Sequence, residues 1–112
     1  MAKYYVIGDM KFSTKKAIHE YYSDMLHNKY SLNERLDLED SKQVYHLLRK
    51  HPNFEEKRGV GIKFFRVETA VQMDIRYANC RGFWIHRHDG SKISFSIKSC
   101  YRFKDQLEKV EA

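Results

Sequence analysis

Cysteine, proline and glycine are scarce in this chain of 112 residues, which contains two, one and five of them. Two cysteines are too few for the disulfide framework of a small secreted domain, and no signal peptide opens the sequence. No run reaches the ~18 apolar residues of a membrane span. The absence of repeats and of Gly- or Pro-rich stretches argues against disorder away from the two ends of the chain. We therefore expect a soluble, cytoplasmic protein with free thiols.

Aromatic residues are abundant: seven Phe, eight Tyr and one Trp form 14% of the chain, within an apolar fraction of 42%. Each large aromatic side chain can bury about 150–250 Å², so a chain of this length can form one hydrophobic core. We expect a single domain over residues 1–112, with its core within residues 12–101.

Helical patterns dominate the N-terminal half, after two short strands at residues 4–7 and 10–12. Ser13 is a candidate N-cap, and the apolar residues that follow it are spaced as one helical face. Residues 28–37 read as a connection. Asp37 and the acidic residues after it predict the start of a second helix.

The C-terminal half favours strands, in β-branched and aromatic runs at residues 60–67, 82–87 and 92–98. Residues 68–81 read as a loop, and residues 101–110 as a short helix. The predicted fold class is α+β: two N-terminal helices packed on one face of a small antiparallel sheet, with a short C-terminal helix.

An Asp-Gly pair at residues 89–90 predicts a hairpin between the last two strands. A two-residue loop would set Ile93 against His86, whereas a three-residue loop over residues 88–90 sets Ile93 against Ile85. The second register gathers the aliphatic and Phe side chains on one face, which the helices can cover, so we predict that register.

The other face of this hairpin holds the single tryptophan among polar side chains. Trp84 shares it with His86, Lys92 and Ser94, a composition typical of a stacking platform for unpaired bases. Alternatively, Trp84 belongs to the core, beneath the C-terminal segment or the 68–81 loop. The sequence leaves both interpretations open.

The net charge of +6 is unevenly distributed. Residues 1–56 hold nine basic and nine acidic residues, whereas residues 57–112 hold twelve and six. Such asymmetry favours a polyanionic partner, although a basic surface can also serve solubility alone. The candidate nucleic-acid-binding residues are Lys57, Arg58, Lys63, Arg66, Arg81, Trp84, His86, Arg87, Lys92, Ser94 and Lys98. Lys57 and Arg87 are also candidates for structural roles, such as pairing with Asp89 or Glu55.

Metal or catalytic chemistry is not expected. His86, His88, Asp89, Cys80 and Cys100 include residue types that bind zinc, but the cysteines lack C-x-x-C spacing. The basic half also has few carboxylates for a metal-dependent nuclease. We predict no metal, no cofactor and no catalytic residue.

Three motifs together resemble one family. They are FSTKKAIHEYY from Phe12, HPNFEEKRGVGIKFFRV from His51 to Val67, and FWIHRHDGSKISFSIKSC from Phe83 to Cys100. Over residues 12–101 the chain is similar to the DCL (defective chloroplasts and leaves) domain of plant plastid proteins. That domain also occurs at the tail of the largest subunit of plant RNA polymerase V and in small bacterial and phage proteins. Gly82 departs from the pattern, because the family often has Cys there.

The resemblance implies a role connected with RNA, since plastid members are linked to processing of ribosomal RNA. With the charge asymmetry, it predicts a non-catalytic nucleic-acid-binding module for RNA, with DNA also open, acting in rRNA processing or transcription. The alternative is a protein-interaction adaptor that docks on RNA polymerase or a ribosomal protein. A metal-dependent nuclease is the third hypothesis.

Overall fold

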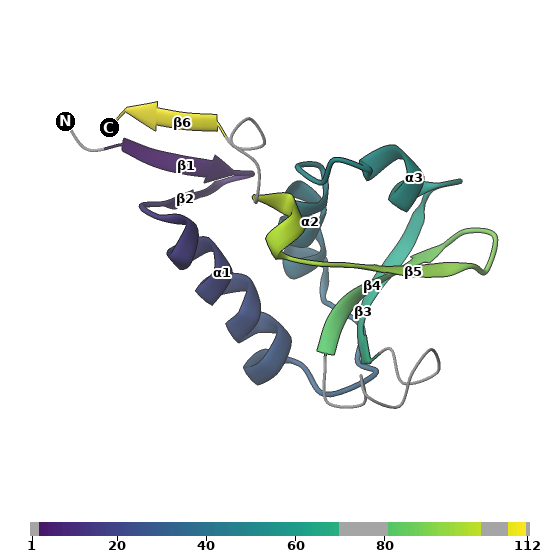
Figure 1. Ribbon diagram of the computed structural model, residues 1–112. Coiled ribbons are helices and arrows are strands. Elements are labelled where there is room, and N and C mark those ends of the chain that lie inside the picture. Colours follow the sequence, from purple (N-terminus) through teal and green to yellow (C-terminus); the bar gives the residue numbers. More distant parts are fainter. Residues whose placement is uncertain (1–2, 70–80, 102–107, 112) are drawn as a thin grey trace.

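The computed structural model describes residues 3–69, 81–101 and 108–111 (Figure 1). Its elements are β1 (Lys3–Ile7), β2 (Met10–Phe12), α1 (Lys15–Asp24), a π-helical turn (Met25–Lys29), α2 (Leu38–Leu48), α3 (Phe54–Arg58), β3 (Ile62–Thr69), β4 (Arg81–Arg87), β5 (Lys92–Phe95), a 3₁₀ turn (Lys98–Cys100) and β6 (Glu108–Glu111). Within this part of the chain the strands form two antiparallel sheets, ordered β2-β1-β6 and β3-β4-β5. The predicted α+β class is confirmed.

Each of the two long helices begins at a side-chain cap. The hydroxyl of Thr14 accepts a 3.0 Å hydrogen bond from the Ala17 amide, so α1 starts one residue later than the predicted cap at Ser13. The Asp37 carboxylate accepts a 2.8 Å bond from the Asp40 amide, which confirms the predicted start of α2. None of the helices in the described ranges is long and apolar enough to cross a membrane.

The core lies between these helices and one face of the sheet β3-β4-β5. Its buried members from the helices are Ile18, Tyr22, Val44, Leu47 and Leu48, and those from the strands are Phe65, Val67, Phe83, Ile85 and Phe95. The helices therefore cover the sheet face that the sequence predicted. Gln43 ties α2 to its neighbours, because its amide nitrogen donates to the Ile7 carbonyl at 2.8 Å and its backbone carbonyl accepts from the Tyr22 hydroxyl at 3.2 Å.

The β4–β5 hairpin has the predicted three-residue loop. Ile85 lies opposite Ile93 and Phe83 lies opposite Phe95. Gly90 has φ +87°, a left-handed conformation that glycine adopts without steric cost. Burial of one face thus decided the register, because a shift by one residue would move the apolar side chains to the other face.

The end of the chain differs from the prediction. The sequence predicted a last strand over residues 92–98, but β5 ends at Phe95. A 3₁₀ turn begins at Lys98, the last residue of that predicted strand. Glu108–Glu111 is the strand β6, paired antiparallel with β1, where the sequence predicted a helix. Pairing with a strand some hundred residues earlier outweighs local propensity here. Most of the expected 68–81 loop, residues 70–80, lies outside the described residues.

Candidate nucleic-acid interface

Trp84 is only 5% exposed, so the predicted stacking platform on this indole is wrong. The residue does lie on the predicted face of β4, with Arg66 and Ser94 as its cross-strand partners. The ammonium group of Lys92 lies 5.3 Å from the centroid of its ring. Strand alternation identified the face of Trp84 but not its burial. The burial expected by the alternative interpretation is observed, whereas most of the 68–81 loop that was expected to cover Trp84 lies outside the described residues.

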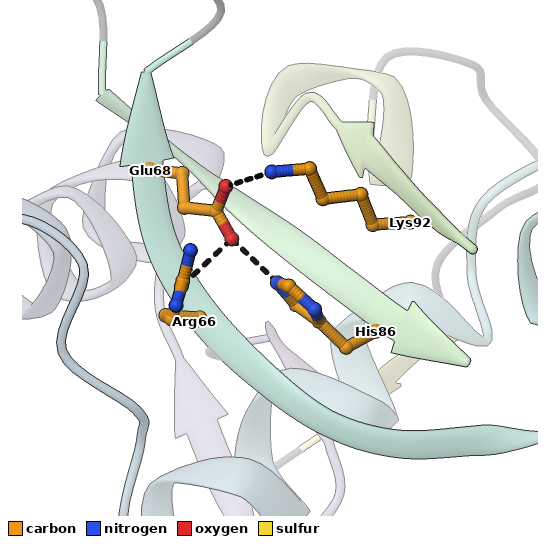
Figure 2. A network of polar contacts seen from close by, with 4 residues as sticks. All are labelled: Arg66, Glu68, His86 and Lys92. Carbon is orange, nitrogen blue, oxygen red and sulfur yellow. Dashed lines mark hydrogen bonds and ion pairs between the residues drawn. The ribbon is translucent and has the colours of Figure 1, made fainter. Parts of the chain in front are cut away.

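A buried carboxylate on the same face engages three of the predicted binding residues (Figure 2). Glu68 is 3% exposed and accepts hydrogen bonds from Arg66 Nε at 2.8 Å, His86 Nε2 at 2.5 Å and Lys92 Nζ at 2.7 Å. Burial alone would raise the pKa of Glu68, but the bonds from Lys92, His86 and Arg66 outweigh it and lower the pKa to about 2. These three side chains are bonded within the fold to one carboxylate, whose single negative charge offsets only one positive charge.

Arg87 is also engaged, as a brace for the C-terminal end of α3. Its guanidinium donates to the carbonyls of Lys57 at 3.1 Å and Glu56 at 3.0 Å, and to the Ser91 hydroxyl at 3.2 Å. Gly59 makes room for it, since a Cβ there would lie 2.8 Å from Arg87 Nε, and its φ of +56° also disfavours other residues. The predicted structural role is confirmed, with carbonyls as partners in place of Asp89 or Glu55.

Lys57 and Arg81 are bound to backbone carbonyls as well. Lys57 Nζ donates to the Ser94 carbonyl at 2.9 Å, which joins α3 to β5. Arg81 Nη1 donates to the Tyr30 carbonyl at 3.0 Å, which joins β4 to the segment after α1. Ser94, which was also in the predicted set, contributes its backbone carbonyl, which accepts the hydrogen bond from Lys57.

Four predicted cations are exposed: Lys92, which is bonded to Glu68, and three others, Arg58, Lys63 and Lys98. Arg58 forms a 2.7 Å ion pair with Glu55 in which both side chains are exposed, so its attraction is weak. Lys63 and Lys98 form no ion pair with other described residues. Lys98 lines a separate hollow of about 300 Å³, so it does not join the other two.

Arg58 and Lys63 meet at a groove of about 560 Å³ between α2, α3 and the outer edge of β3. Its described lining residues are Arg35, Leu36, Leu38, Ser41, Lys42, Tyr45, Arg58, Ile62, Lys63, Phe64 and Phe65. Four of these are cationic, most of the others are apolar, and none is a carboxylate. A positive rim around an apolar floor is suited to an anionic ligand with a flat or apolar part.

A stack of three planar groups forms one wall of this groove. The rings of Phe64 and His86 have centroids 4.4 Å apart and planes within 13° of parallel. The guanidinium carbon of Arg35 lies 3.9 Å from the Phe64 centroid. His86, which was in the predicted set, thus lies behind the groove while Arg35 faces it.

Backbone hydrogen bonds hold Arg35 in this position. The segment before α2 pairs with the outer edge of β3, where the Asn33 amide donates to Val67 at 2.6 Å and the Leu36 amide donates to Phe65 at 3.0 Å. Arg35 itself forms an antiparallel bridge with Arg66. The arginine therefore stands on a fixed strand-like segment, although the sequence predicted only a connection there.

The opposite wall is one face of α2. Leu38, Ser41, Lys42 and Tyr45 follow the i, i+3, i+4, i+7 spacing of a helical stripe, which could have indicated a shared surface. Leu38 is 69% exposed and Tyr45 36%, an unusual exposure for large apolar groups. Sequence reasoning missed this wall because it assigned the apolar residues of the helix to the core.

Side chains that could hold a metal ion are not clustered in the described ranges. No cluster of three His, Cys, Asp or Glu residues occurs in them. Burial raises the pKa of the Cys100 thiol to about 12, more than Lys57 lowers it, so the thiol stays protonated at neutral pH. Cys80 lies outside the described residues.

Comparison with solved structures gives a match over most of the chain. The solution NMR structure of an uncharacterized protein from Rhodospirillum rubrum superposes with a TM-score of 0.74 at 29% sequence identity, over 85% of each chain. No curated protein matches this sequence. The fold therefore recurs in a second protein, which itself has no assigned activity.

A family model matches residues 23–101, and it is not that of the DCL family. The resemblance inferred from the three motifs is therefore corrected, and the first of them, at residues 12–22, lies outside the match. The matched segment includes both walls of the groove. The chain belongs to the family described as "Protein of unknown function (DUF3223)".

Proposed function

We propose that this domain is a non-catalytic nucleic-acid-binding module with RNA as its main ligand. The observation that carries the proposal is the groove along β3, where four cations surround an apolar floor without a carboxylate among the described lining residues. Phosphate contacts with such cations release condensed counterions, which supplies affinity. Arg58 and Lys63 come from the predicted set, and Arg35 and Lys42 join them.

RNA is favoured over duplex DNA by the shape of the site. A groove of about 560 Å³ has room for a nucleotide, whereas duplex DNA is read by a helix or β-ribbon that enters its major groove. Proteins recognise RNA mostly at loops and ends, where unpaired bases can enter such a site. A cytoplasmic location, expected from the scarcity of cysteine, is compatible with this ligand.

Direct binding to defined oligonucleotides tests the proposal. Fluorescence anisotropy would compare single-stranded RNA of about 12 nucleotides with duplex RNA and DNA, at about 50 mM and about 200 mM salt. We expect binding of the single strand that weakens as salt rises. The double variant Lys42→Glu, Lys63→Glu should abolish it.

A charge-matched control uses lysines away from the groove. Lys11 and Lys16 are both exposed, on β2 and α1, and Lys11→Glu, Lys16→Glu changes the net charge by the same amount. This control should retain most of the binding. If both double variants lose RNA binding equally, net charge alone explains the effect and the groove has no special role. If the unmodified protein does not bind RNA at low salt, the proposal is refuted.

A second candidate function is docking of a protein partner, such as RNA polymerase or a ribosomal protein. The exposure of Leu38 and Tyr45 favours it, because apolar side chains at the rim of a groove can anchor an interface. The test uses a purified acidic peptide that contains leucine. If the protein binds this peptide but not RNA, and Leu38→Ser weakens peptide binding, the second function is favoured over the first.

A further inference from the structure

The outer face of Arg35 is the candidate for a stacking surface in the groove. Arg35 is exposed and lines the groove, while its guanidinium carbon lies 3.9 Å from the centroid of the Phe64 ring. On the other side of Phe64, the ring of His86 is stacked at 4.4 Å. Both faces of Phe64 are thus occupied, and the last plane of the stack is a guanidinium.

The order of this stack follows from the strands. His86 on β4 is the cross-strand partner of Phe64, and Arg35 forms a bridge to Arg66 at the opposite edge of β3. β3 therefore lies between the two residues. Two planar groups in contact with one ring at about 4 Å cannot share the same face, so they flank Phe64. Arg35 therefore lies on the side of Phe64 away from His86, where it lines the groove.

Arg35 is also held in place before any ligand arrives. The backbone around it is bonded to β3 at 2.6 Å and 3.0 Å, and the buried side chain of Leu36 anchors the next residue. A free arginine loses much rotamer freedom when it is ordered by a ligand. Because the guanidinium of Arg35 already contacts Phe64, a base that stacks on it causes a smaller loss of conformational entropy than a base that stacks on a mobile side chain.

We infer that Arg35 stacks on an unpaired base, while Lys42, Arg58 and Lys63 contact phosphates, so the groove selects single-stranded or looped RNA over duplex. This inference rests on the proposed function. Arginine planes are known to stack on splayed bases, and the groove volume suits one nucleotide. In a duplex the faces of each base are covered by its neighbours, so the Arg35 plane has no free base to cover.

The decisive variant is Arg35→Lys, which keeps the positive charge and removes the plane. Loss of one stacked base should weaken single-strand binding about tenfold, with an unchanged salt dependence. The matched control Lys63→Met removes a charge and keeps the plane. It should reduce the salt dependence while the preference for single strands over duplex remains.

An abasic RNA of the same length separates stacking from charge on the ligand side. The unmodified protein should bind it as weakly as Arg35→Lys binds the normal strand, and Arg35→Lys should not distinguish the two strands. Phe64→Leu, which removes the support beneath Arg35, is expected to reduce discrimination as well. An amide NMR spectrum of each variant would verify that the fold is retained.

The outcomes also separate this inference from the proposed function. If the protein binds single strand and duplex equally, with salt dependence, and Arg35→Lys matches the unmodified protein, stacking is refuted and nucleic-acid binding stands. If the unmodified protein binds none of these nucleic acids, the proposed function fails as well. Equal effects of Arg35→Lys on normal and abasic strands would also refute stacking.

Discussion

Two regions along the sheet β3-β4-β5 carry several cations each, yet they differ in what those cations contact. Around Glu68, the side chains of Arg66, His86 and Lys92 are bonded to one buried carboxylate. Along the outer edge of β3, Lys63 and the residues near it surround an open groove. The first region holds the fold together, and the second is available to a ligand.

The difference shows that a count of cations in a sequence measures neither surface charge nor binding capacity. A cation bonded to carbonyls or to a buried carboxylate has fewer donors left for phosphate, and a neighbouring carboxylate offsets part of the positive charge. Four predictions test the contrast, in order of decreasing effect.

The largest effect is expected for Glu68→Gln, which leaves three donors facing a neutral amide. Breaking a buried ion network typically costs about 3–5 kcal/mol, and we expect a loss of that order in the free energy of unfolding from urea titration. Glu55→Gln, which removes an exposed pair with Arg58, should cost less than ~1 kcal/mol. If the two variants lose similar free energy of unfolding, the buried Glu68 network stabilises the fold no more than the exposed ion pair does.

Acid should weaken the Glu68 region selectively. The folded-state pKa of Glu68 is about 2, against an ordinary value of 4.5, so the unfolded chain takes up this proton first as the pH falls. The contribution of Glu68 is complete above pH 4.5 and declines towards pH 2, by on the order of 3 kcal/mol. Urea titrations across this range should give a steeper decline for the unmodified protein than for Glu68→Gln, and parallel curves would contradict the assignment.

Gly59→Ala should destabilise the brace of α3 by roughly 2 kcal/mol, because its positive φ disfavours alanine and the new Cβ would displace Arg87. Gly82→Ala is the matched control, since a Cβ at Gly82 meets nothing within 4 Å. Thermal unfolding of the two variants would measure the difference. A tolerated alanine at residue 59 would mean that Arg87 can move without cost.

The smallest change in stability is expected at the groove. Lys63→Met should alter the free energy of unfolding by less than ~0.5 kcal/mol, while the logarithmic salt slope of RNA binding falls by about 0.7. Lys92→Met should do the reverse, with lower stability and an unchanged slope. If Lys92→Met changes the slope as well, the two regions are not separate.

Local patterns predicted those features that depend on near neighbours. The hairpin register followed from alternation of Ile85 and Ile93 with an Asp-Gly turn, and the cap at Asp37 followed from its side chain. Both are decided by contacts within a few residues or across one turn. The classes of the two long helices and of β3, β4 and β5 are correct for the same reason, whereas β6 was predicted as a helix.

The groove and the network depend on contacts that no local pattern records. Arg35 lies in a segment without a periodic pattern of apolar residues. The residue that it contacts, Phe64, lies on β3, much later in the sequence. Glu68 looked like one of a few acidic residues in a basic half, yet it accepts hydrogen bonds from three side chains. Alternation identified the face of Trp84, but burial depends on what packs over a face, which alternation cannot specify.

The pairing of β1 with β6 has a consequence for the connectivity of the domain. Lys3 and Glu111 are cross-strand partners, and Figure 1 shows the two strands side by side. Paired residues in an antiparallel ladder lie about 5 Å apart, so a short peptide could join them into a ring. New ends could then be cut at the exposed loop around Gly90, giving a circular permutant, and the domain could be inserted whole into a loop of a host protein without separating its strands.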